Sequence, residues 1–600
     1  MRILPNIFLI LLSSFVFSQS SASSSIVLKN SENLFPIQNL VDNRIAHVQL
    51  NKEDNLGIEP FVETLNKYTS VDNIENLKQE KVVSVLAGYN IVIFSISYTN
   101  IDWKLLYKIT KLLPQVKTIG VSFVQFDNFQ QNNFLFNADA LIQFSDFKKS
   151  TQVKAASLIF GGGESTGVLK ADIGTRYKKD DGIIMVNRIR LGYGLASDVG
   201  LDSVYINNKV DSIMTKGIEE KAFPGAQLLV AKSGTVIYHK SFGFHTFDSI
   251  VQVDNNDLYD LASVTKITGP LPVLMQMVDN GKLDLDTPFS NYWKPWKHKR
   301  NKKDLTLREI LAHQAGLEPY YIFLQEIMKE GEFKRRYVRK EPSKKFSLEI
   351  YDGLYLNKNF IKKVYRIINR TEVSAEKKYK YSGLSFLISP ELIKQLTGVP
   401  YENYVRDSIY KPLGANTLMF NPSGKYPDSL IVPTELDSVY RKAYIKGWVH
   451  DENASLLGGV SGNAGLFGTA NDLAKLIKMY QNMGVYGGKK YISEATLIEF
   501  TRVQYPENGN KRGLGFDKPL LNNSELDIAH ASPAPEVSAK SFGHAGFTGT
   551  YVWADPENDL LFIFLSNRVY PTREHRNLYS LNIRPSLQQV FYKAENIITN

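Results

Sequence analysis

Short apolar runs alternate with helical patterns between about residues 80 and 170, and they predict a small layered α/β unit. Ile91–Ile96, Thr118–Phe123 and Ala140–Phe144 are nearly continuous apolar runs, typical of strands buried on both faces. Trp103–Leu113 and Thr151–Phe160 carry apolar residues at helical spacing. Because strands and helices alternate along the chain, we expect a parallel sheet covered by helices.

The pattern changes from about Leu201 onwards. Gly225–Ala231 and Thr235–Gly243 flank a Ser-Gly turn, and Gly549–Ala554 and Leu560–Ser566 flank the turn Asp555–Asn558, so each pair predicts a β-hairpin. The residues between 261 and 500 are mostly helical in pattern, with Gly- and Pro-rich joints. A sheet built from both ends of a segment around a helical insertion is an α+β architecture. Its cleft, between sheet and helices, is where such a domain would hold a substrate.

These patterns divide the chain into three predicted parts. Residues 1–19 form a signal peptide, because Arg2 precedes the compact apolar run Ile7–Phe17, which is too short to span a bilayer comfortably. Residues 20–200 form a smaller α/β sandwich domain, and residues 201–600 an α+β domain with an antiparallel sheet, flanking helices and a helical subdomain. An uncleaved N-terminal anchor is the alternative for the first part. We expect a mature protein that is periplasmic or secreted and has no transmembrane segment.

The composition and charge of the chain exclude several kinds of functional site. The chain has 600 residues and no cysteine, which excludes disulfides, cysteine nucleophiles and thiolate metal sites. Its net charge of +10 is concentrated mainly in Lys294–Lys303 and Lys329–Lys345, and such runs are more often solvated loops than binding sites. No nucleic-acid motif accompanies them, so we expect no nucleic-acid partner. A weak, salt-sensitive attraction to an anionic envelope surface is compatible with the charge.

The best candidate nucleophile is Ser263, in the segment Ser-Val-Thr-Lys that ends at Lys266. The segment opens a helical pattern, Ile267–Val278, that Asn280-Gly281 closes. A lysine one turn beyond the serine lies on the same helix face, and the positive helix N-terminus favours an alkoxide. If buried, this lysine could accept the serine proton. The alternative is a surface cap serine with a solvated lysine.

Two later segments supply partners for this pair. Tyr381, in Tyr-Ser-Gly before an apolar helical run, could relay protons and is preferred over Tyr379, although a packing tyrosine is the alternative. Gly543–Gly549 leads into a predicted strand, and Gly546 there lets a substrate approach the backbone.

The same Gly-rich segment supplies candidate binding groups. The backbone N–H groups of Ser263 and Phe547 could form an oxyanion hole. His544 is expected to face the cleft, with a purely structural histidine as the alternative.

The chain carries a serine with a lysine one turn on, then a tyrosine motif, and then a basic-x-Gly strand. This order of motifs resembles the serine β-lactamase/penicillin-binding protein superfamily. The resemblance runs from about Leu201 to the C-terminus and includes LTLREILAHQAGL, VHDENASLLGGVSGNAGLFGTANDLAK and FLSNRVYP. It implies an acyl-enzyme on Ser263, with Lys266 and Tyr381 sharing base and acid duties in an order that stays open. It also implies no metal and no organic cofactor.

Two departures from the family pattern indicate which branch of the family the chain resembles. Gly383 stands where β-lactamases often carry an asparagine, and His544 stands where they usually carry a lysine. A neutral imidazole binds a carboxylate poorly. Asn463, in VSGNAG, could supply the missing cleft amide, or it is a loop residue that satisfies turn chemistry. The pattern resembles the esterase, D-aminopeptidase and muramoyl-peptide amidase branches rather than an efficient β-lactamase or D-Ala-D-Ala peptidase.

The N-terminal part resembles the C-terminal α/β domain of family-three glycoside hydrolases. The similar segments are ALIQF, QVKAASLIFGGGESTGVLKADIG and RLGYGLA, ending at Ala196. That family's catalytic aspartate lies in a preceding barrel, and residues 1–80 are too few to form one. We therefore expect a scaffold without glycosidase chemistry. Relatives with this layout join a cell-wall β-N-acetylglucosaminidase to a hydrolase domain, which suggests a peptidoglycan fragment as substrate by analogy.

The sequence thus favours an exported serine acyl hydrolase that cleaves an amide or ester in a small molecule or cell-wall fragment. The alternative is a catalytically silent cell-wall-binding or sensor protein with the same fold. A true β-lactamase is the least favoured function. The oligomeric state stays open.

Overall fold

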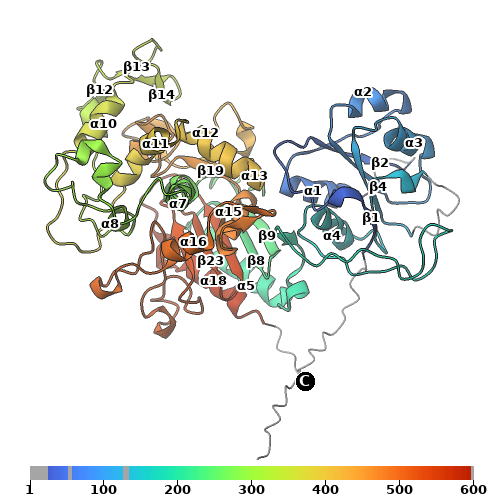
Figure 1. Ribbon diagram of the computed structural model, residues 1–600. Coiled ribbons are helices and arrows are strands. Elements are labelled where there is room, and N and C mark those ends of the chain that lie inside the picture. Colours follow the sequence, from blue (N-terminus) through green and yellow to red (C-terminus); the bar gives the residue numbers. More distant parts are fainter. Residues whose placement is uncertain (1–24, 52–56, 126–133, 596–600) are drawn as a thin grey trace, which may run out of the picture.

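The computed structural model describes residues 25–51, 57–125 and 134–595, and the predicted signal peptide, residues 1–19, lies outside these ranges. Two six-stranded sheets organise the described chain, and Figure 1 shows them as two adjoining units. None of the helices within these ranges combines the length and the apolar character that a bilayer crossing requires.

The N-terminal sheet has the strand order β1-β6-β5-β4-β2-β3. Its parallel strands are β2 (Ile45–Gln49), β3 (Val71–Asn73), β4 (Ile91–Ile96), β5 (Lys117–Ser122) and β6 (Ala140–Gln143). β1 (Ile26–Asn30) is antiparallel to β6 at one edge. The predicted parallel sheet is confirmed, and β4 is buried at every position because helices cover both faces.

Four helices cover this sheet. α1 (Glu59–Tyr68) and α4 (Lys149–Ile159) share one buried cluster with one face of the strands. α2 (Val82–Leu86) and α3 (Trp103–Lys111) share another cluster with the opposite face. The Asp102 carboxylate begins α3 by accepting hydrogen bonds from the N–H groups of Lys104 and Leu105. Both helices predicted from apolar spacing, α3 and α4, are present.

The second sheet has the order β22-β23-β24-β8-β9-β7. It contains β7 (Gly192–Tyr193), β8 (Gly225–Lys232), β9 (Thr235–Gly243), β22 (Phe542–Ala545), β23 (Tyr551–Asp555) and β24 (Leu560–Ser566). Both predicted hairpins are present, and β24 pairs with β8, so the sheet is built from both ends of the segment. The short β7 runs parallel to β9 and connects the chain before residue 200 to this sheet.

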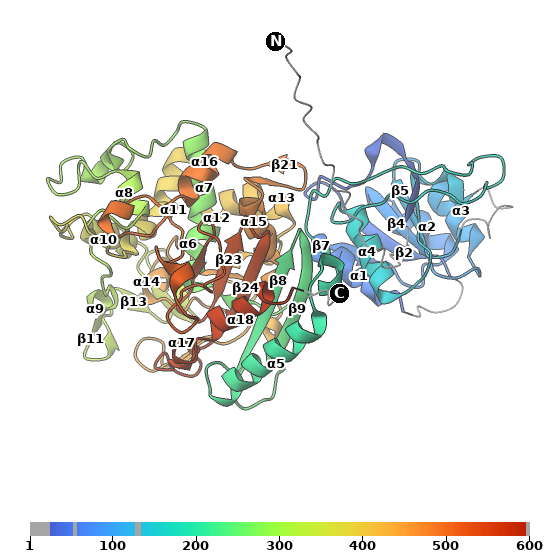
Figure 2. The same ribbon diagram turned by 90° about the horizontal axis from the view of Figure 1, so that it is seen from below.

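Helices cover both faces of the second sheet. Phe562 and Phe564 of β24 point to the cluster with α5 (Ser203–Glu219) and α18 (Ile583–Tyr592). Leu561 and Ile563 point to the opposite cluster, which includes α7 (Pro270–Asp279) and α15 (Ala470–Gln481). Figure 2 shows the sheet between these helices. The predicted α+β class, with a sheet flanked by helices and a smaller α/β unit before it, is confirmed.

The segment between the two hairpins is less uniformly helical than the sequence indicates. Its remaining helices are α6 (Thr265–Thr268), α8 (Leu307–Leu311), α9 (Leu324–Ile327), α10 (Phe360–Ile368), α11 (Leu384–Thr397), α12 (Tyr401–Val405), α13 (Lys411–Leu413), α14 (Glu452–Ser455) and α16 (Glu494–Thr501), with α17 (Asn577–Ser580) after the last strand. Its short strands are β10 (Tyr259–Asp260), β11 (Met328–Lys329), β12 (Glu332–Phe333), β13 (Val338–Arg339), β14 (Leu348–Tyr351), β15 (Leu354–Leu356), β16 (Met419–Phe420), β17 (Leu436–Asp437), β18 (Ala443–Tyr444), β19 (Leu466–Gly468), β20 (Val485–Tyr486) and β21 (Lys489–Lys490). Strands this short are too brief for a period-two pattern to be recognised.

Hydrogen bonds join the two units. The Asn471 side-chain amide on α15 donates to the Lys67 carbonyl at the end of α1, at 3.0 Å. The buried Lys475 amine on α15 donates to the Asp472 carboxylate at 2.7 Å and to the Tyr68 carbonyl at 3.3 Å. Because a buried amine needs such partners, these contacts hold α15 against the N-terminal unit.

Candidate active site

Ser263 lies in a tight turn that the Asp260 carboxylate holds. The turn, a 3₁₀ segment Ala262–Val264, follows β10 and runs directly into α6. Ala262 has φ of +45°, an unusual conformation for a residue with a Cβ atom. Asp260 accepts hydrogen bonds from the N–H of Ala262 at 2.8 Å and from the N–H of His450 at 2.6 Å. Burial raises the pKa of Asp260 although both N–H groups oppose the shift.

The helix that carries Lys266 is broken one turn later. α6 ends at Thr268, and α7 begins with Pro270, so Gly269 separates two helices. A Cβ atom at Gly269 would lie 2.2 Å from the Tyr401 hydroxyl. α7 ends at Asp279, just before Asn280-Gly281, as the sequence indicates.

Lys266 lies one turn beyond Ser263, with its amine against the serine. The distance from Lys266 Nζ to Ser263 Oγ is 2.9 Å, and Nζ also donates to the backbone carbonyl of Asn463 at 2.8 Å. The lysine is only 2% exposed. Among the described residues, no carboxylate lies within ion-pair distance of this amine. The carbonyl therefore orients the amine towards the serine without adding a counter-charge.

Tyr381 contacts the same serine, and its ring centroid lies 5.5 Å from the Lys266 amine. Its hydroxyl lies 3.4 Å from Ser263 Oγ. The segment that carries it is fixed, because Ser382 donates its hydroxyl to the Glu318 carbonyl at 2.6 Å just before α11 begins. Gly383 follows, and a Cβ atom there would meet no atom within 4 Å.

His313, which no sequence motif predicts as a site residue, positions Tyr381. The two rings lie 4.5 Å apart, and His313 Nδ1 accepts a hydrogen bond from the N–H of Ser382 at 3.2 Å. Burial lowers the pKa of His313 well below its ordinary value, and the nearby Arg512 lowers it further. The imidazole is therefore neutral, with its proton on Nε2. His313 belongs to the family-like segment LTLREILAHQAGL, but nothing in the pattern singled it out.

Arg512 and Asp517 form a second group beside Tyr381 that the sequence does not predict. The Arg512 guanidinium pairs with the Asp517 carboxylate and lies 5.7 Å from the Tyr381 ring centroid. Burial opposes ionisation of Asp517, but Arg512 and His544 outweigh it and hold the pKa of this carboxyl below its usual value. The guanidinium and the carboxylate of this pair therefore neutralise each other beside Tyr381.

His544, on β22, lies near Tyr381, and its imidazole is neutral. Its ring is 6.4 Å from the Tyr381 ring, and Nδ1 lies 2.8 Å from the Ala545 carbonyl and 3.9 Å from the Asp517 carboxylate. Burial lowers the pKa of His544 to about 4, an effect that Asp517 opposes and Arg512 reinforces. At neutral pH the side chain therefore offers no positive charge to a substrate carboxylate.

The turn after β22 is fitted closely against the nucleophile segment. A Cβ atom at Gly546 would lie 2.0 Å from the Thr550 hydroxyl and 2.6 Å from the Leu261 carbonyl, so only glycine fits. Thr550 and Thr548 donate their hydroxyls to the carbonyls of Leu261 and Asp260, at 3.0 and 2.7 Å. These bonds fix the turn that carries Phe547.

Phe547 extends from this turn towards solvent. Its side chain is 42% exposed, and its ring stacks against His450 at 5.7 Å and under the Arg568 guanidinium at 4.5 Å. Within the described part of the chain, the Phe547 N–H has no hydrogen-bond acceptor. Its role in an oxyanion hole with the Ser263 N–H stays a prediction.

Asn463 contacts Lys266 through its backbone carbonyl and not through its side chain. Its amide donates to the Asp451 carboxylate at 3.1 Å and accepts from the Ser461 hydroxyl at 2.7 Å. The amide is thus bonded to Ser461 and to Asp451 at the start of α14, and the Asn463 carbonyl is bonded to Lys266. The predicted substrate contact of this amide has no support in these bonds.

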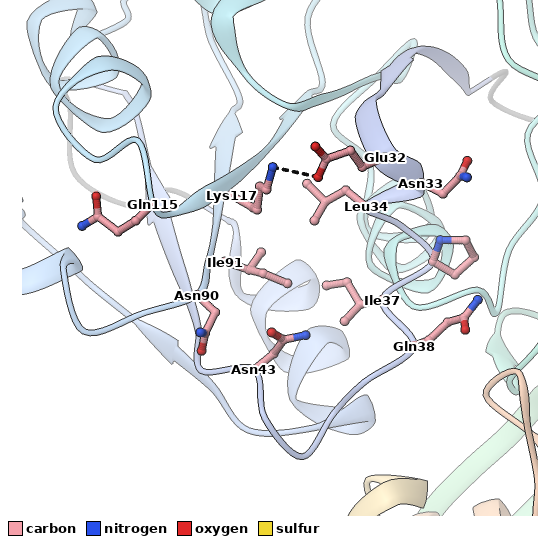
Figure 3. Close-up of a pocket in the computed structure, with 11 residues that line it drawn as sticks. Glu32, Asn33, Leu34, Ile37, Gln38, Asn43, Asn90, Ile91, Gln115 and Lys117 are labelled. Atoms are coloured by element: carbon pink, nitrogen blue, oxygen red, sulfur yellow. Dashed lines mark hydrogen bonds and ion pairs between the residues drawn. The ribbon is translucent and has the colours of Figure 1, made fainter.

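The cavity drawn in Figure 3 lies away from Ser263. It measures about 560 Å³ and lies at the amino ends of β4 and β5, where Lys117 forms an ion pair with Glu32 at 2.9 Å. Ligands of open parallel sheets bind at the carboxyl ends instead. Across the described ranges, no three His, Asp or Glu side chains gather as potential ligands of a metal ion.

Comparisons with known proteins match the part of the chain that carries this geometry. The model of the family described as Beta-lactamase matches residues 210–583. A Salmonella gallinarum protein, provisionally named a D-alanyl-D-alanine carboxypeptidase, is 30% identical over 404 residues, which cover 62% of this chain and 84% of that protein.

Solved structures resemble the same share of the chain at low sequence identity. EstCE1, described as a hydrolase with promiscuous acyltransferase activity, is 18% identical, with a TM-score of 0.46 over 64% of this chain and 98% of its own. The D-amino acid amidase of Ochrobactrum anthropi SV3 is 15% identical, with a TM-score of 0.45 over 64% and 98%.

Proposed function

This chain belongs to the β-lactamase family, and we propose that it is an exported serine hydrolase that forms an acyl-enzyme on Ser263. The observation that carries the proposal is the 2.9 Å contact between the buried Lys266 amine and Ser263 Oγ. A nucleophile paired with an adjacent base is the arrangement that activates a serine for acyl transfer.

The first half-reaction uses the two groups that contact the serine. Ser263 Oγ attacks the substrate carbonyl carbon and gives its proton to the Lys266 amine, which is held by the Asn463 carbonyl and accepts a proton when neutral. Tyr381, 3.4 Å from the same oxygen, is the alternative acceptor. The protonated group then gives the proton to the leaving nitrogen or oxygen as the C–N or C–O bond breaks. Water repeats the sequence against the acyl-enzyme and releases the acid.

Charge that develops on the carbonyl oxygen needs fixed donors. We assign this role to the N–H groups of Ser263 and Phe547, because the threonine bonds of the 546–550 turn hold Phe547 against the nucleophile segment. Donors fixed before the reaction stabilise the oxyanion without reorganisation, and losing one typically costs about 10²–10³ in rate.

The neutral His544 supports a substrate without a free carboxylate next to the scissile bond. The named function of the Salmonella relatives, D-alanyl-D-alanine carboxypeptidase, requires recognition of such a carboxylate. Here Arg512, a cation beside Tyr381, is already paired with Asp517. An ester, or an amide such as that of a D-amino acid or a muramoyl peptide, therefore fits the site better.

Two further parts of the proposal rest on the sequence. The predicted signal peptide, residues 1–19, supports a periplasmic or secreted location. The resemblance of the N-terminal unit to family-three glycoside hydrolases supports a peptidoglycan-derived fragment as the substrate, by analogy.

A matched pair of substrates tests this specificity. The protein is assayed on a muropeptide that ends in a free D-alanine carboxylate and on the same muropeptide ending in the amide, with Ser263→Ala as the control for background hydrolysis. We expect kcat/KM to favour the amide by at least about tenfold. The free carboxylate would lose its charge-assisted hydrogen bonds to water and find no cationic partner among the described residues of the site, and such a bond is worth about 1.5–3 kcal/mol. A preference for the free carboxylate, or rapid hydrolysis of a chromogenic cephalosporin, would contradict the proposed substrate class.

A further inference from the structure

A second cavity, of about 650 Å³, lies in the helical part of the chain. It is bounded by α10, by the C-terminal half of α11 and by the residues around the turn Lys294–Trp296. Figures 1 and 2 both show α10 at the end of the molecule opposite the N-terminal unit. None of the candidate active-site residues lines this groove, so its chemistry is separate from that of Ser263.

The groove is strongly basic. Its lining includes one carboxylate, Glu391, and five cations, which are Lys299, Lys358, Lys362, Arg366 and Arg370. Within the described chain, none of the five forms an ion pair. Lys363, the residue after Lys362, pairs with Glu326 at 2.5 Å. The cations that line the groove therefore lack carboxylate partners among the described residues, whereas Lys363 on the same helix has one.

Four of the cations repeat at every fourth position along α10 and its ends, from Lys358 to Arg370. Lys362 and Arg366 lie within α10, where a rise of about 1.5 Å per residue places them roughly 6 Å apart along the axis on one face, and Lys358 and Arg370 flank the helix. Like charges at this spacing destabilise a helix. A row of four is therefore unfavourable unless anions neutralise it.

The wall behind these cations is rigid. The indole N–H groups of Trp293 and Trp296 both donate to the Asn369 side-chain oxygen, at 2.8 and 2.9 Å. The Trp293 ring meets the Tyr365 ring edge to face at 5.6 Å. The backbone that presents the row of cations is thus held in place before any ligand arrives.

We propose that this groove binds an extended chain of phosphate groups, with successive phosphates neutralised by successive cations of α10. Arginine binds phosphate with a planar fork and lysine binds it as a point charge, and the groove offers both. A single phosphate would contact only one or two of the five cations. The repeat therefore fits a linear polyanion.

Two other anionic partners fit the groove less well. A membrane-surface helix needs an exposed apolar face, whereas Phe360, Val364 and Ile368 of α10 are buried and Ile361 and Ile367 are partly buried. Single-stranded nucleic acid uses aromatic faces on which bases stack, and Trp293 is only 3% exposed.

Binding of the purified protein to a fluorescent inorganic polyphosphate chain tests the proposal. By counterion release along a flexible strand, five contacts predict about 100-fold weaker binding between 50 and 200 mM salt. The double variant Lys362→Glu/Arg366→Glu removes two contacts and is expected to bind about 25-fold more weakly at 0.1 M salt. Both residues are exposed, so the variant should keep the parent's unfolding midpoint.

The matched control is Lys78→Glu/Lys81→Glu, which changes the net charge equally at exposed lysines of the N-terminal unit, at the other end of the molecule from α10. It should bind within about twofold of the parent, because distant exposed charges are screened. Equal weakening in both double variants would overturn the proposal in favour of a net-charge effect. Displacement of the chain by an equal concentration of inorganic phosphate would overturn it in favour of a single-anion site. Groove-dependent binding to phosphatidylglycerol vesicles without chain binding would overturn it in favour of a lipid surface.

Discussion

Replacing His544 with glutamine should make the protein less sensitive to acid. Burial lowers the pKa of His544 to about 4, against an ordinary value of 6.5. Between these two values the unfolded chain binds a proton that the native protein does not bind, so the free energy of unfolding falls as the pH falls. With these two pKa values, the loss attributable to His544 between pH 7 and pH 5 is about 2 kcal/mol.

Urea unfolding of the parent and of His544→Gln at pH 7 and pH 5 measures this difference. Burial also lowers the pKa of His47 to about 4 and that of His239 to about 3, so the parent loses stability from several sites. The variant should lose about 2 kcal/mol less than the parent over this range. His530→Gln, at an imidazole whose side chain is 73% exposed, is the matched control and should leave the pH dependence close to that of the parent.

The imidazole resonances give a direct second measurement. The signal that disappears in His544→Gln should titrate near pH 4 in the parent. Titration near 6.5, together with an unchanged pH dependence of stability in the variant, would refute the assignment of a neutral His544. The argument for a substrate without a carboxylate would then fail, because the site would gain a cation in weakly acidic solution.

Three further substitutions test the other parts of the site. Lys266→Ala should slow acylation of Ser263 by about 10²–10⁴-fold, measured as the rate of fluorophosphonate labelling, and a rate equal to the parent's would contradict its role as base. Gly383→Asn places an amide where a Cβ atom meets nothing within 4 Å, so the unfolding midpoint should stay unchanged while kcat/KM for acylamide substrates rises; a fall in the midpoint would show that this space is not free. Asp260→Ala leaves two buried backbone N–H groups without their acceptor and should cost about 1–3 kcal/mol for each, measured by urea unfolding, and an unchanged stability would contradict its role in holding the turn.

The elements that the sequence predicts well are those whose signal is local. Buried parallel strands such as β4 are recognisable because every position is apolar, and α3 because its apolar residues recur at helical spacing. The contact of Lys266 with Ser263 is equally local, since residues three apart on a helical turn share a face.

The parts that the sequence does not predict depend on contacts between distant residues. His313, Arg512 and Asp517 surround Tyr381 through tertiary packing that no periodic pattern records. The carbonyl that orients Lys266 belongs to Asn463, but any residue type supplies a carbonyl, so the side chain attracted the prediction instead. The resemblance of residues 20–200 to family-three glycoside hydrolases stays a prediction.

Intact-mass analysis after fluorophosphonate labelling tests the central claim most directly. The reagent phosphonylates only an activated serine, so the parent protein should gain the mass of one adduct. Ser263→Ala should gain none, while Ser408→Ala, which alters another Ser-x-x-Lys pair, should label like the parent. No adduct on the folded parent, or an adduct that persists in Ser263→Ala, would contradict the assignment of Ser263 as the nucleophile and favour a binding or sensor protein with the same fold.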